Sequence, residues 1–487
     1  MRDDIIRARL VDANPWWRTT ATGRNPTAWA RDDQVLRNRG PFDLGYRPDV
    51  LDDVMHGAVD DKLVVLRGPR RVGKSVLLKD VVYALCGRPD IDPRQIIYLP
   101  TDAMRASDLN RVAVIGRDLT RSIELARRVW LLDEITSVVD WTATIKYLRD
   151  NTPFGEDTVV CTGSSWDHTA EVERDLLAGR AGRHAARRLR LLLPMRFRDV
   201  VATTSRNVPL PQPVAPWDLQ SHGVAVAARD AELFTDVLDL AWQSYLTSGG
   251  FPRAVAEQHR DGQVSDAFVG DLVAWLHRDV DPEQPEDSAA LLLDELARRS
   301  VSPLNRTAAA HALNYTSRQT FDVRLARLLA SFAAFWCPQV DERGIRVAGA
   351  QSKLYLVDPL LAWLGSRARA GLAAPDFTRL TENALAVAMA RAIDDLQPGR
   401  WSTQDTIGYL RTARGNEVDF APVAVPTSAG VEHTTPLESK WVTDGWRGDA
   451  RVIKNKLGRG VLATRNVVDV GGPTWALPAP LVALLLG

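Results

Sequence analysis

At 487 residues the chain is too long for a single hydrophobic core, and usual domain sizes predict about three or four units. Its 61 basic and 61 acidic side chains cancel, which excludes a global positive field that would attract nucleic acid. Any nucleic-acid surface would therefore have to be a local patch. With 45% hydrophobic and 25% charged residues, the composition is that of an ordinary soluble globular protein.

The N-terminal residues and the cysteines bear on the cellular compartment. The start, "MRDDIIRARLVDANPWW", carries charges where a signal peptide has its apolar core, and the apolar runs of the chain are too short to span a bilayer. Cys86, Cys161 and Cys337 lack the spacing of a zinc site, and we expect them to be small core residues in a reducing compartment. The sequence therefore predicts a cytoplasmic protein without a membrane partner.

The first half of the chain has the pattern of an α/β domain. Residues 1–40 are polar with amphipathic patches and are expected to form an N-terminal extension. From residue 41 to 200, short apolar runs such as "KLVVLRG", "QIIYLP" and "DTVVCTGSS" alternate with helical patterns. Buried strands that alternate with helices are typical of a parallel sheet covered on both faces. This layout is that of nucleotide-binding domains.

The second half of the chain is predicted in three parts. Residues 201–284 contain a Pro-rich loop at 207–218 and are otherwise helical, as in a helical lid. Residues 285–368 show three helical patterns and then two strand-like runs, "FAAFWCP" and "KLYLVD", which is the order of a winged-helix module. Residues 369–487 mix helices and strands, and the turn "RGN" between apolar runs predicts a hairpin.

The stretch "GPRRVGKS" fits the phosphate-loop pattern GxxxxGK[ST], between an apolar strand and an apolar helix. Its backbone N–H groups are expected to wrap phosphates, Lys74 to reach the β and γ phosphates, and Ser75 to ligate Mg²⁺. The bland alternative is a Gly-containing loop, but the flanking pattern favours an ATP site in a P-loop NTPase sheet. The residues expected to contact the nucleotide are Gly68, Pro69, Arg70, Arg71, Val72, Gly73, Lys74, Ser75 and Val76.

The stretch "VWLLDEI" is the expected partner of the phosphate loop. It places two acids at the end of an apolar strand, so that Asp133 can hold Mg²⁺ through water and Glu134 can polarise the attacking water. A strand that ends in acids is common, and this string becomes informative because it follows a phosphate loop.

Two further stretches carry candidate groups for the same site. The buried run "VVCTGSS" ends in Thr162, Gly163, Ser164 and Ser165, and the hydroxyls of the threonine and the two serines could orient the nucleophilic water. The alternative is a strand followed by a polar turn. In "LLAGRAGR", Arg180 and Arg183 are candidates for stabilising charge in the transition state, with Arg180 expected to contact the nucleotide. Either arginine could equally be a surface or interface residue.

Several of these motifs together resemble a known family. They are "LRGPRRVGKSVLL", "LLDEI", "TGSS", "LAGRAGR…LRLLLPMRF", "YLTSGGFPRAV" and "NEVDF…LESK". They are similar to the bacterial and archaeal AAA-type ATPases that carry a C-terminal restriction-endonuclease-like domain of PD-(D/E)XK type, over residues of about 40 to 465. The resemblance implies an ATPase core, a helical and winged-helix middle, and a nuclease-like α/β end. Relatives tend to have a small polar residue where this chain has Arg196, which leaves the local loop open.

The resemblance also implies a second chemical site in residues 369–487. Domains of this type hold Mg²⁺ or Mn²⁺ with carboxylates and orient water with a lysine. The matching residues are Glu382, Asp419 and Glu438 as metal ligands and Lys440 as the catalytic ammonium. On a strand, Glu438 and Lys440 would share one face, and the alternative for them is a surface ion pair of little consequence. Glu417 is a neighbour or a competing ligand of Asp419.

The helix predicted at 315–329 admits two interpretations. As the recognition helix of a winged helix, it would offer Ser317, Arg318 and Gln319 to a DNA major groove. Winged helices also serve as packing units, and the apolar content of this helix slightly favours that role. Arg318, Arg324 and Arg327 could equally form a solvated face.

These observations lead to one principal functional hypothesis and two others. In the first, ATP binding and hydrolysis gate a metal-dependent nuclease that acts on DNA or RNA. In the second, the chain is an ATP-dependent regulatory switch or a DNA-binding protein whose nuclease-like end is a non-catalytic scaffold. A third, weaker hypothesis is a remodeller of proteins. Assembly into an oligomer or ring stays open, because no arginine can be assigned to a neighbouring copy.

Overall fold

The computed structural model describes residues 1–60, 63–121, 127–165, 189–205, 208–370 and 374–487. The chain divides into two compact units. Unit 1 comprises residues 1–43 and 47–193, and unit 2 comprises residues 44–46 and 194–487. The finer division of unit 2 into a lid, a winged helix and a nuclease-like end stays a prediction.

Unit 1 is built on a five-stranded sheet with the strand order β2-β3-β4-β1-β5. All of its pairings are parallel. The strands are β1 (Leu63–Arg67), β2 (Ile96–Pro100), β3 (Val129–Asp133), β4 (Thr158–Gly163) and β5 (Leu189–Leu191). This is the α/β sheet of a P-loop NTPase, so the predicted fold class is confirmed.

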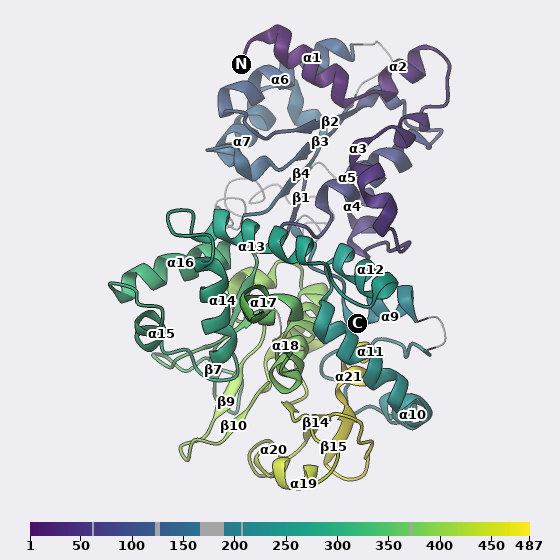
Figure 1. The fold of residues 1–487 in the computed structure, drawn as a ribbon. Helices are drawn as coiled ribbons and strands as arrows, with labels where there is room; N and C mark the ends of the chain where they lie inside the picture. Colours follow the sequence, from purple (N-terminus) through teal and green to yellow (C-terminus); the bar gives the residue numbers. More distant parts are fainter. Residues whose placement is uncertain (61–62, 122–126, 166–188, 206–207, 371–373) are drawn as a thin grey trace. The chain divides into compact units, whose positions relative to one another are not determined.

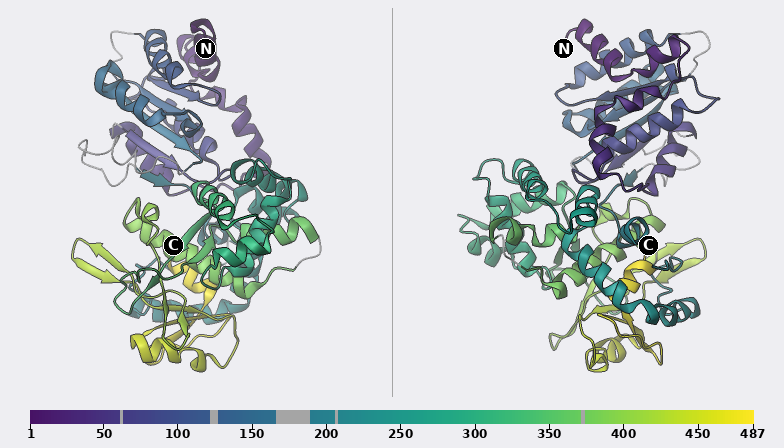
Figure 2. Two further views of the ribbon diagram at one scale, coloured as in Figure 1. Left: turned by 90° about the vertical axis from the view of Figure 1, so that its left-hand side faces the viewer. Right: turned by 45° about the vertical axis from the view of Figure 1, so that its right-hand side comes forward.

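Helices cover both faces of this sheet, and Figures 1 and 2 show them on its two sides. They are α1 (Asp3–Ala13), α2 (Trp16–Ala21), α3 (Gln34–Arg39), α4 (Val50–Asp60), α5 (Lys74–Cys86), α6 (Ala106–Leu119) and α7 (Trp141–Asn151). Alternate strand residues such as Leu63 and Val65, or Ile97 and Leu99, join one core with apolar residues of α1, α6 and α7. The remaining strand residues are buried as well, which explains why the strands are continuously apolar.

The N-terminal extension is an integral part of unit 1. The Asn14 amide donates to the carbonyl oxygen of Tyr98 at 2.9 Å, and its oxygen accepts from the Tyr98 N–H at 2.7 Å. The indole of Trp16 donates to the Ile96 carbonyl at 3.0 Å. These side chains supply hydrogen-bond partners to the outer edge of β2, which is an edge strand that would otherwise expose its backbone.

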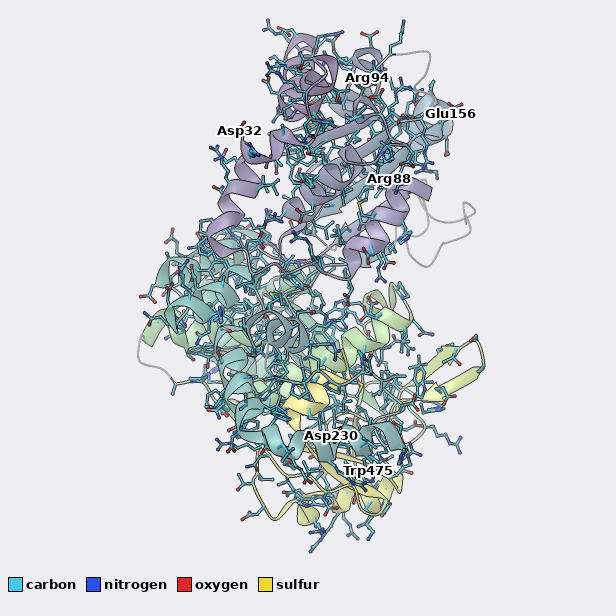
Figure 3. All side chains as sticks on the ribbon, turned by 90° about the vertical axis from the view of Figure 1, so that its right-hand side faces the viewer. Asp32, Arg88, Arg94, Glu156, Asp230 and Trp475 are labelled. Carbon is cyan, nitrogen blue, oxygen red and sulfur yellow. The ribbon has the colours of Figure 1, made fainter. Side chains whose placement is uncertain are left out.

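The surface of unit 1 carries the charged side chains that its composition predicts. Asp32, Arg88 and Glu156 are exposed and point outward in Figure 3. The three cysteines of the chain are buried and unpaired, as predicted for small core residues. Burial raises the pKa of the Cys86 and Cys161 thiols to about 12. No helix among the described residues is long and apolar enough to cross a membrane.

Unit 2 begins with a helical region, as predicted. Its helices are α9 (Phe197–Thr204), α10 (His222–Ala231), α11 (Thr235–Ser248), α12 (Pro252–Asp261), α13 (Asp266–Val280), α14 (Ser288–Arg299), α15 (Arg306–Ala312), α16 (Arg318–Ala330), α17 (Pro359–Ala370), α18 (Phe377–Leu396), α19 (Trp446–Asp449), α20 (Arg451–Leu457) and α21 (Ala479–Leu485). The Gly-Gly-Phe-Pro segment joins α11 to α12. There Gly249 has a φ of +66°, and a Cβ atom on it would lie 1.9 Å from the carboxylate of buried Asp358.

The strands of unit 2 form small separate sheets. They are β6 (Ala334–Cys337), β7 (Gln339–Val340), β8 (Lys353–Leu356), β9 (Tyr409–Arg411), β10 (Glu417–Val418), β11 (Ala424–Thr427), β12 (Gly430–His433), β13 (Leu437–Ser439), β14 (Gly460–Thr464) and β15 (Thr474–Pro478). β6 and β8 pair antiparallel after α14, α15 and α16, and β9 and β10 form the predicted hairpin. β13, β14 and β15 form a parallel sheet. In the second group of candidate residues, Glu438 lies on β13, Glu382 lies on α18, and Asp419 follows β10.

Candidate functional site

The phosphate loop lies between β1 and α5, where the sequence places it. Gly68 has to be glycine, because a Cβ atom there would lie 1.9 Å from the carbonyl oxygen of Leu192. Gly73 has a φ of +98° and directly precedes α5, so it too adopts a conformation that favours glycine. The N-terminus of α5, a helix of 13 residues, therefore opens directly from the loop.

Lys74 is buried and bonded within the loop itself. Its ammonium group donates to the carbonyl oxygens of Gly68 and Pro69, each at 2.8 Å. Ser75 follows in the first turn of α5. Lys74 and Ser75 are thus the first two residues of α5. At this end of a helix, the backbone N–H groups and the helix dipole favour the binding of phosphate.

Asp133 ends β3 and is held by two neutral donors. The Tyr98 hydroxyl donates to its Oδ2 at 2.9 Å, and the Thr162 hydroxyl donates to its Oδ1 at 2.6 Å. Each carboxylate oxygen therefore keeps a further lone pair. Oxygen donors of this kind, with the hydroxyl of Ser75, suit a hard divalent cation such as Mg²⁺. The residue types at this site fit the cation that the sequence predicts.

Glu134 is positioned by the end of β4. Its backbone has a φ of +56°, in the left-handed region that few residues other than glycine adopt. Its N–H donates to Thr162 Oγ1 at 3.0 Å, and its Oε1 accepts from the Ser164 N–H at 3.2 Å and from the Ser164 hydroxyl. Thr162 therefore contacts both acids, and the polar end of β4 fixes their positions. The sequence analysis expected these hydroxyls to orient the attacking water, and that role stays a prediction.

The structure adds Asp102, which the sequence analysis did not single out. It follows β2, the strand next to β3 in the sheet. Burial, together with the charges of Glu134 and Asp133, raises the pKa of Asp102, while Arg70 lowers it. The carboxyl ends of neighbouring parallel strands meet at one edge of a sheet. The polar residues "TD" after the run "QIIYLP" are therefore the signal that could have identified this position.

Some predicted residues of this site are not described by the structure. Arg180 and Arg183 lie outside the described residues, so their proposed contacts with nucleotide stay predictions. Arg70 and Arg71 are in the loop, and Arg71 has a φ of +69°.

The comparisons with known proteins agree with this class of fold. Residues 60–201 match the model of an AAA domain, and residues 239–368 match a domain of unknown function (DUF8612). The sheet, the phosphate loop and the acids of β3 thus give unit 1 a P-loop NTPase fold, and its residues 60–193 lie within the match to the AAA domain. No curated protein matches the chain.

Two of the similar solved structures illustrate the likeness. The chain is 15% identical to a Walker-type ATPase of Pyrococcus abyssi, with a TM-score of 0.38, over 67% of this chain and 99% of that one. It is 12% identical to a DNA polymerase III gamma subunit-related protein of Thermotoga maritima MSB8, with a TM-score of 0.24, over 58% of this chain and 100% of that one. Likeness at this level carries no functional argument for this chain.

The candidate residues of unit 2 do converge, but around a lysine. We call Glu382, Glu417, Asp419 and Glu438 the acidic cluster. Lys353 Nζ, on β8, lies 3.2 Å from Glu382 Oε1, 3.0 Å from Asp419 Oδ1 and 3.3 Å from Glu417 Oε2. Its side chain is 1% exposed. The sequence analysis did not assign Lys353 to this site.

Glu438 lies beside Asp419 and pairs with Lys440. The N–H of Asp419 donates to Glu438 Oε2 at 3.1 Å, and the N–H of Ser439 donates to Asp419 Oδ2 at 3.0 Å. Lys440 Nζ lies 3.0 Å from Glu438 Oε1, with a side chain that is 40% exposed while that of Glu438 is 8% exposed. The pair is therefore half-buried, and differs from the surface ion pair considered as the alternative.

Two acids of this cluster, Glu382 and Glu438, have raised pKa values. Burial, and then the charge of Asp419, raises the pKa of Glu382 to about 7 and that of Glu438 to about 8. Burial lowers the pKa of Lys353, but the charges of Asp419 and Glu382 outweigh it, so this pKa is raised and the lysine is charged. The cluster therefore contains a permanent cation.

The acidic cluster does not fit the divalent metal that the resemblance implies. In the described part of the chain, no group of three or more His, Cys, Asp or Glu side chains is placed to hold a metal ion. The oxygens that would ligate the ion are bonded to Lys353, to Lys440, to backbone N–H groups and to Tyr355, whose hydroxyl donates to Glu382 at 2.6 Å. We therefore derive no metal-dependent step at this cluster.

The structure also describes the candidate residues of α16 and the departure at Arg196. Arg324 is buried on α16 and bonded to Asp281 at 2.5 Å, so it does not belong to a solvated face. Ser317 caps this helix, accepting from the Thr320 N–H at 3.2 Å. Arg196 precedes α9 and pairs with Asp395, which gives the departure at this position a structural role.

Proposed function

We propose that the chain binds ATP with Mg²⁺ at residues 68–76 and hydrolyses it, as an ATP-dependent regulatory switch. The observation that carries the proposal is the placement of Glu134, whose carboxylate and backbone are both fixed by the polar end of β4 beside Asp133. A carboxylate held in this way, on the strand end that follows a phosphate loop, suits the activation of water.

Each side chain has a distinct part in this proposal. Lys74 exchanges its loop carbonyls for the β and γ phosphates, and the N–H groups at the start of α5 bind the same phosphates. Ser75 and Asp133 would hold Mg²⁺, which neutralises charge on the phosphates when bound. Glu134 orients and polarises the attacking water, and Thr162 keeps the two acids in register.

The direct test replaces Glu134 with Gln. This change keeps the size and hydrogen bonding of the side chain but removes the charge that accepts a proton. We expect ATP binding to be retained and kcat to fall by about 10²- to 10⁴-fold, which is the usual contribution of a general base. Glu156→Gln is the matched control, because Glu156 is exposed on the same unit. Unchanged turnover in Glu134→Gln would remove Glu134 from this role.

For the C-terminal end of the chain, we propose a non-catalytic scaffold rather than a nuclease gated by ATP. The support is the cation that already lies among its carboxylates. DNA or RNA as a partner stays a prediction. Single- and double-stranded DNA and RNA would be incubated with the protein and Mg²⁺ or Mn²⁺, with and without ATP. We expect no cleavage, whereas cleavage that is lost in Lys440→Ala would favour the nuclease hypothesis.

A further inference from the structure

Lys353 occupies the centre of the acidic cluster. Three carboxylates lie within 3.3 Å of its Nζ atom. An ammonium group has three N–H donors and no acceptor. Glu382 and Asp419 accept hydrogen bonds from it, and Glu417 forms an ion pair with the same nitrogen. The ring of Tyr409 lies 5.4 Å from the same nitrogen and adds a cation–π contact. A cation is thus supplied from within the chain at the point where the acids converge.

The same point is where a divalent ion would have to sit. Hard divalent cations bind carboxylate oxygens at distances of about 2.0 to 2.6 Å, and several of them must face one centre. Here the oxygens of Glu382 and Asp419 that face the centre already accept from Lys353 at 3.2 and 3.0 Å. The lysine side chain is 1% exposed and therefore fills the space between the acids.

The backbone holds this lysine in place. Lys353 begins β8, which pairs antiparallel with β6. Leu356 lies three residues further along β8. Its N–H donates to the side-chain oxygen of Asn383 at 2.9 Å, and its carbonyl oxygen accepts from the side-chain amide of Asn383 at 2.8 Å. Asn383 is the neighbour of Glu382 on α18, so one hydrogen-bonded pair fixes the strand that carries the cation against the helix that carries an acid. This geometry favours a lysine that stays in the cluster over one that moves out of it.

The cluster also joins two parts of the chain. Lys353 lies within residues 239–368, which match a domain of unknown function, whereas the four acids all follow that segment. The N-terminal part of unit 2 therefore neutralises the acids of the C-terminal part.

We propose that Lys353 is a permanent internal cation that stands in place of a divalent metal in the acidic cluster, and that loss of its charge converts the cluster into a site for a hard divalent ion. The inference does not depend on ATP hydrolysis. Its test contains no nucleotide, so its failure is distinguishable from failure of the ATPase proposal.

The test counts bound Mn²⁺ on the full chain by electron paramagnetic resonance, in which bound Mn²⁺ is lost from the free-ion signal. Wild type and Asp419→Asn are expected to bind the same number of Mn²⁺ ions, because Asp419 binds no ion in the wild type. Lys353→Met, which keeps the length of the side chain without its charge, is expected to gain one ion. The double variant with Asp419→Asn is expected to lose it again.

Lys440→Met is the matched control, since it removes the other lysine that pairs with the cluster. It is expected to gain no ion while Lys353 stays. Melting curves recorded with and without Mn²⁺ report folding, and Mn²⁺ should raise the melting temperature of Lys353→Met but not that of wild type. The proposal is overturned if wild type binds an ion that Asp419→Asn loses, or if folded Lys353→Met gains none. Should Lys353→Met not fold, the comparison of wild type with Asp419→Asn decides alone.

Discussion

The two acidic sites of the chain differ in where the lysine lies. In unit 1, Lys74 bonds to carbonyl oxygens of its own loop, and Asp133 and Glu134 accept from hydroxyl and N–H groups. Among the described residues, neither of these acids forms an ion pair within 4.0 Å. In unit 2, Lys353 lies between the acids themselves.

This difference decides what each site can bind. Acids that accept from neutral donors keep their charge and free lone pairs for a metal and its water. Acids around an internal ammonium are neutralised within the fold, where an unpaired buried charge would be costly. Both units combine acids with a lysine. The position of the lysine favours an ATP site in unit 1 and a structural ion cluster in unit 2.

A large effect on ATP binding is expected at the phosphate loop of unit 1. Lys74→Ala removes the ammonium that is proposed to reach the β and γ phosphates. Loss of such a charged contact costs about 2 to 5 kcal/mol, which weakens ATP binding by roughly 30-fold or more. Titration with a fluorescent ATP analogue would measure it, with Lys146→Ala as the control. Unchanged affinity would contradict the assignment of the loop.

The next prediction tests the acidic cluster of unit 2 by the unfolding free energy of its lysine variants. Lys353→Met leaves buried carboxylates without their cation, and breaking a buried ion pair costs about 3 to 5 kcal/mol of unfolding free energy. Lys440→Met removes a lysine whose side chain is 40% exposed, so a smaller loss of unfolding free energy than that of Lys353→Met is expected. Urea unfolding of both variants compares them directly. Equal losses would show that Lys353 is not the principal cation of the cluster.

A smaller effect is expected at the residue that holds Asp133. Tyr98→Phe removes the hydroxyl that donates to Asp133 Oδ2 at 2.9 Å, while the bond from Thr162 remains. Groups that orient a metal ligand typically contribute about 10-fold or more to affinity or activity. We expect a roughly 10-fold higher Mg²⁺ requirement for ATP hydrolysis, measured by varying Mg²⁺ at fixed ATP. Tyr147→Phe, at an exposed position, should leave it unchanged.

The last prediction concerns the stability of the sheet edge in unit 1. Asn14→Ala removes both hydrogen bonds to the backbone of Tyr98. A buried backbone pair left without partners costs about 1 to 3 kcal/mol, so the variant should unfold at lower urea concentration while ATP turnover is retained below the transition. Lost turnover in the folded variant would mean that the N-terminal extension takes part in the ATP site.

The sequence allowed the ATP site to be predicted because its residues follow local rules. A phosphate loop is one continuous stretch, and the acids of β3 and the hydroxyls of β4 come at strand ends that a parallel sheet brings together. Asp102 followed the same rule and was missed. Arg180 and Arg183 lie outside the described residues and stay predictions.

Lys353 could not be placed by such rules. It lies 29 residues before Glu382 and 66 before Asp419, on a strand of a different sheet, so its pairing depends on tertiary packing. A hint was present, because lysine is scarce in this chain and Lys353 and Tyr355 share one face of an apolar strand. The acids alone suggested a metal site, and only their packing shows the cation among them.

One measurement tests the central claim most directly. Crystals of the full chain grown with Mn²⁺ and a non-hydrolysable ATP analogue would be examined by anomalous diffraction at the manganese edge. The account predicts a peak beside Ser75 and Asp133 and none among Glu382, Asp419 and Glu438. A second peak within that acidic cluster, with Lys353 displaced from it, would contradict the account.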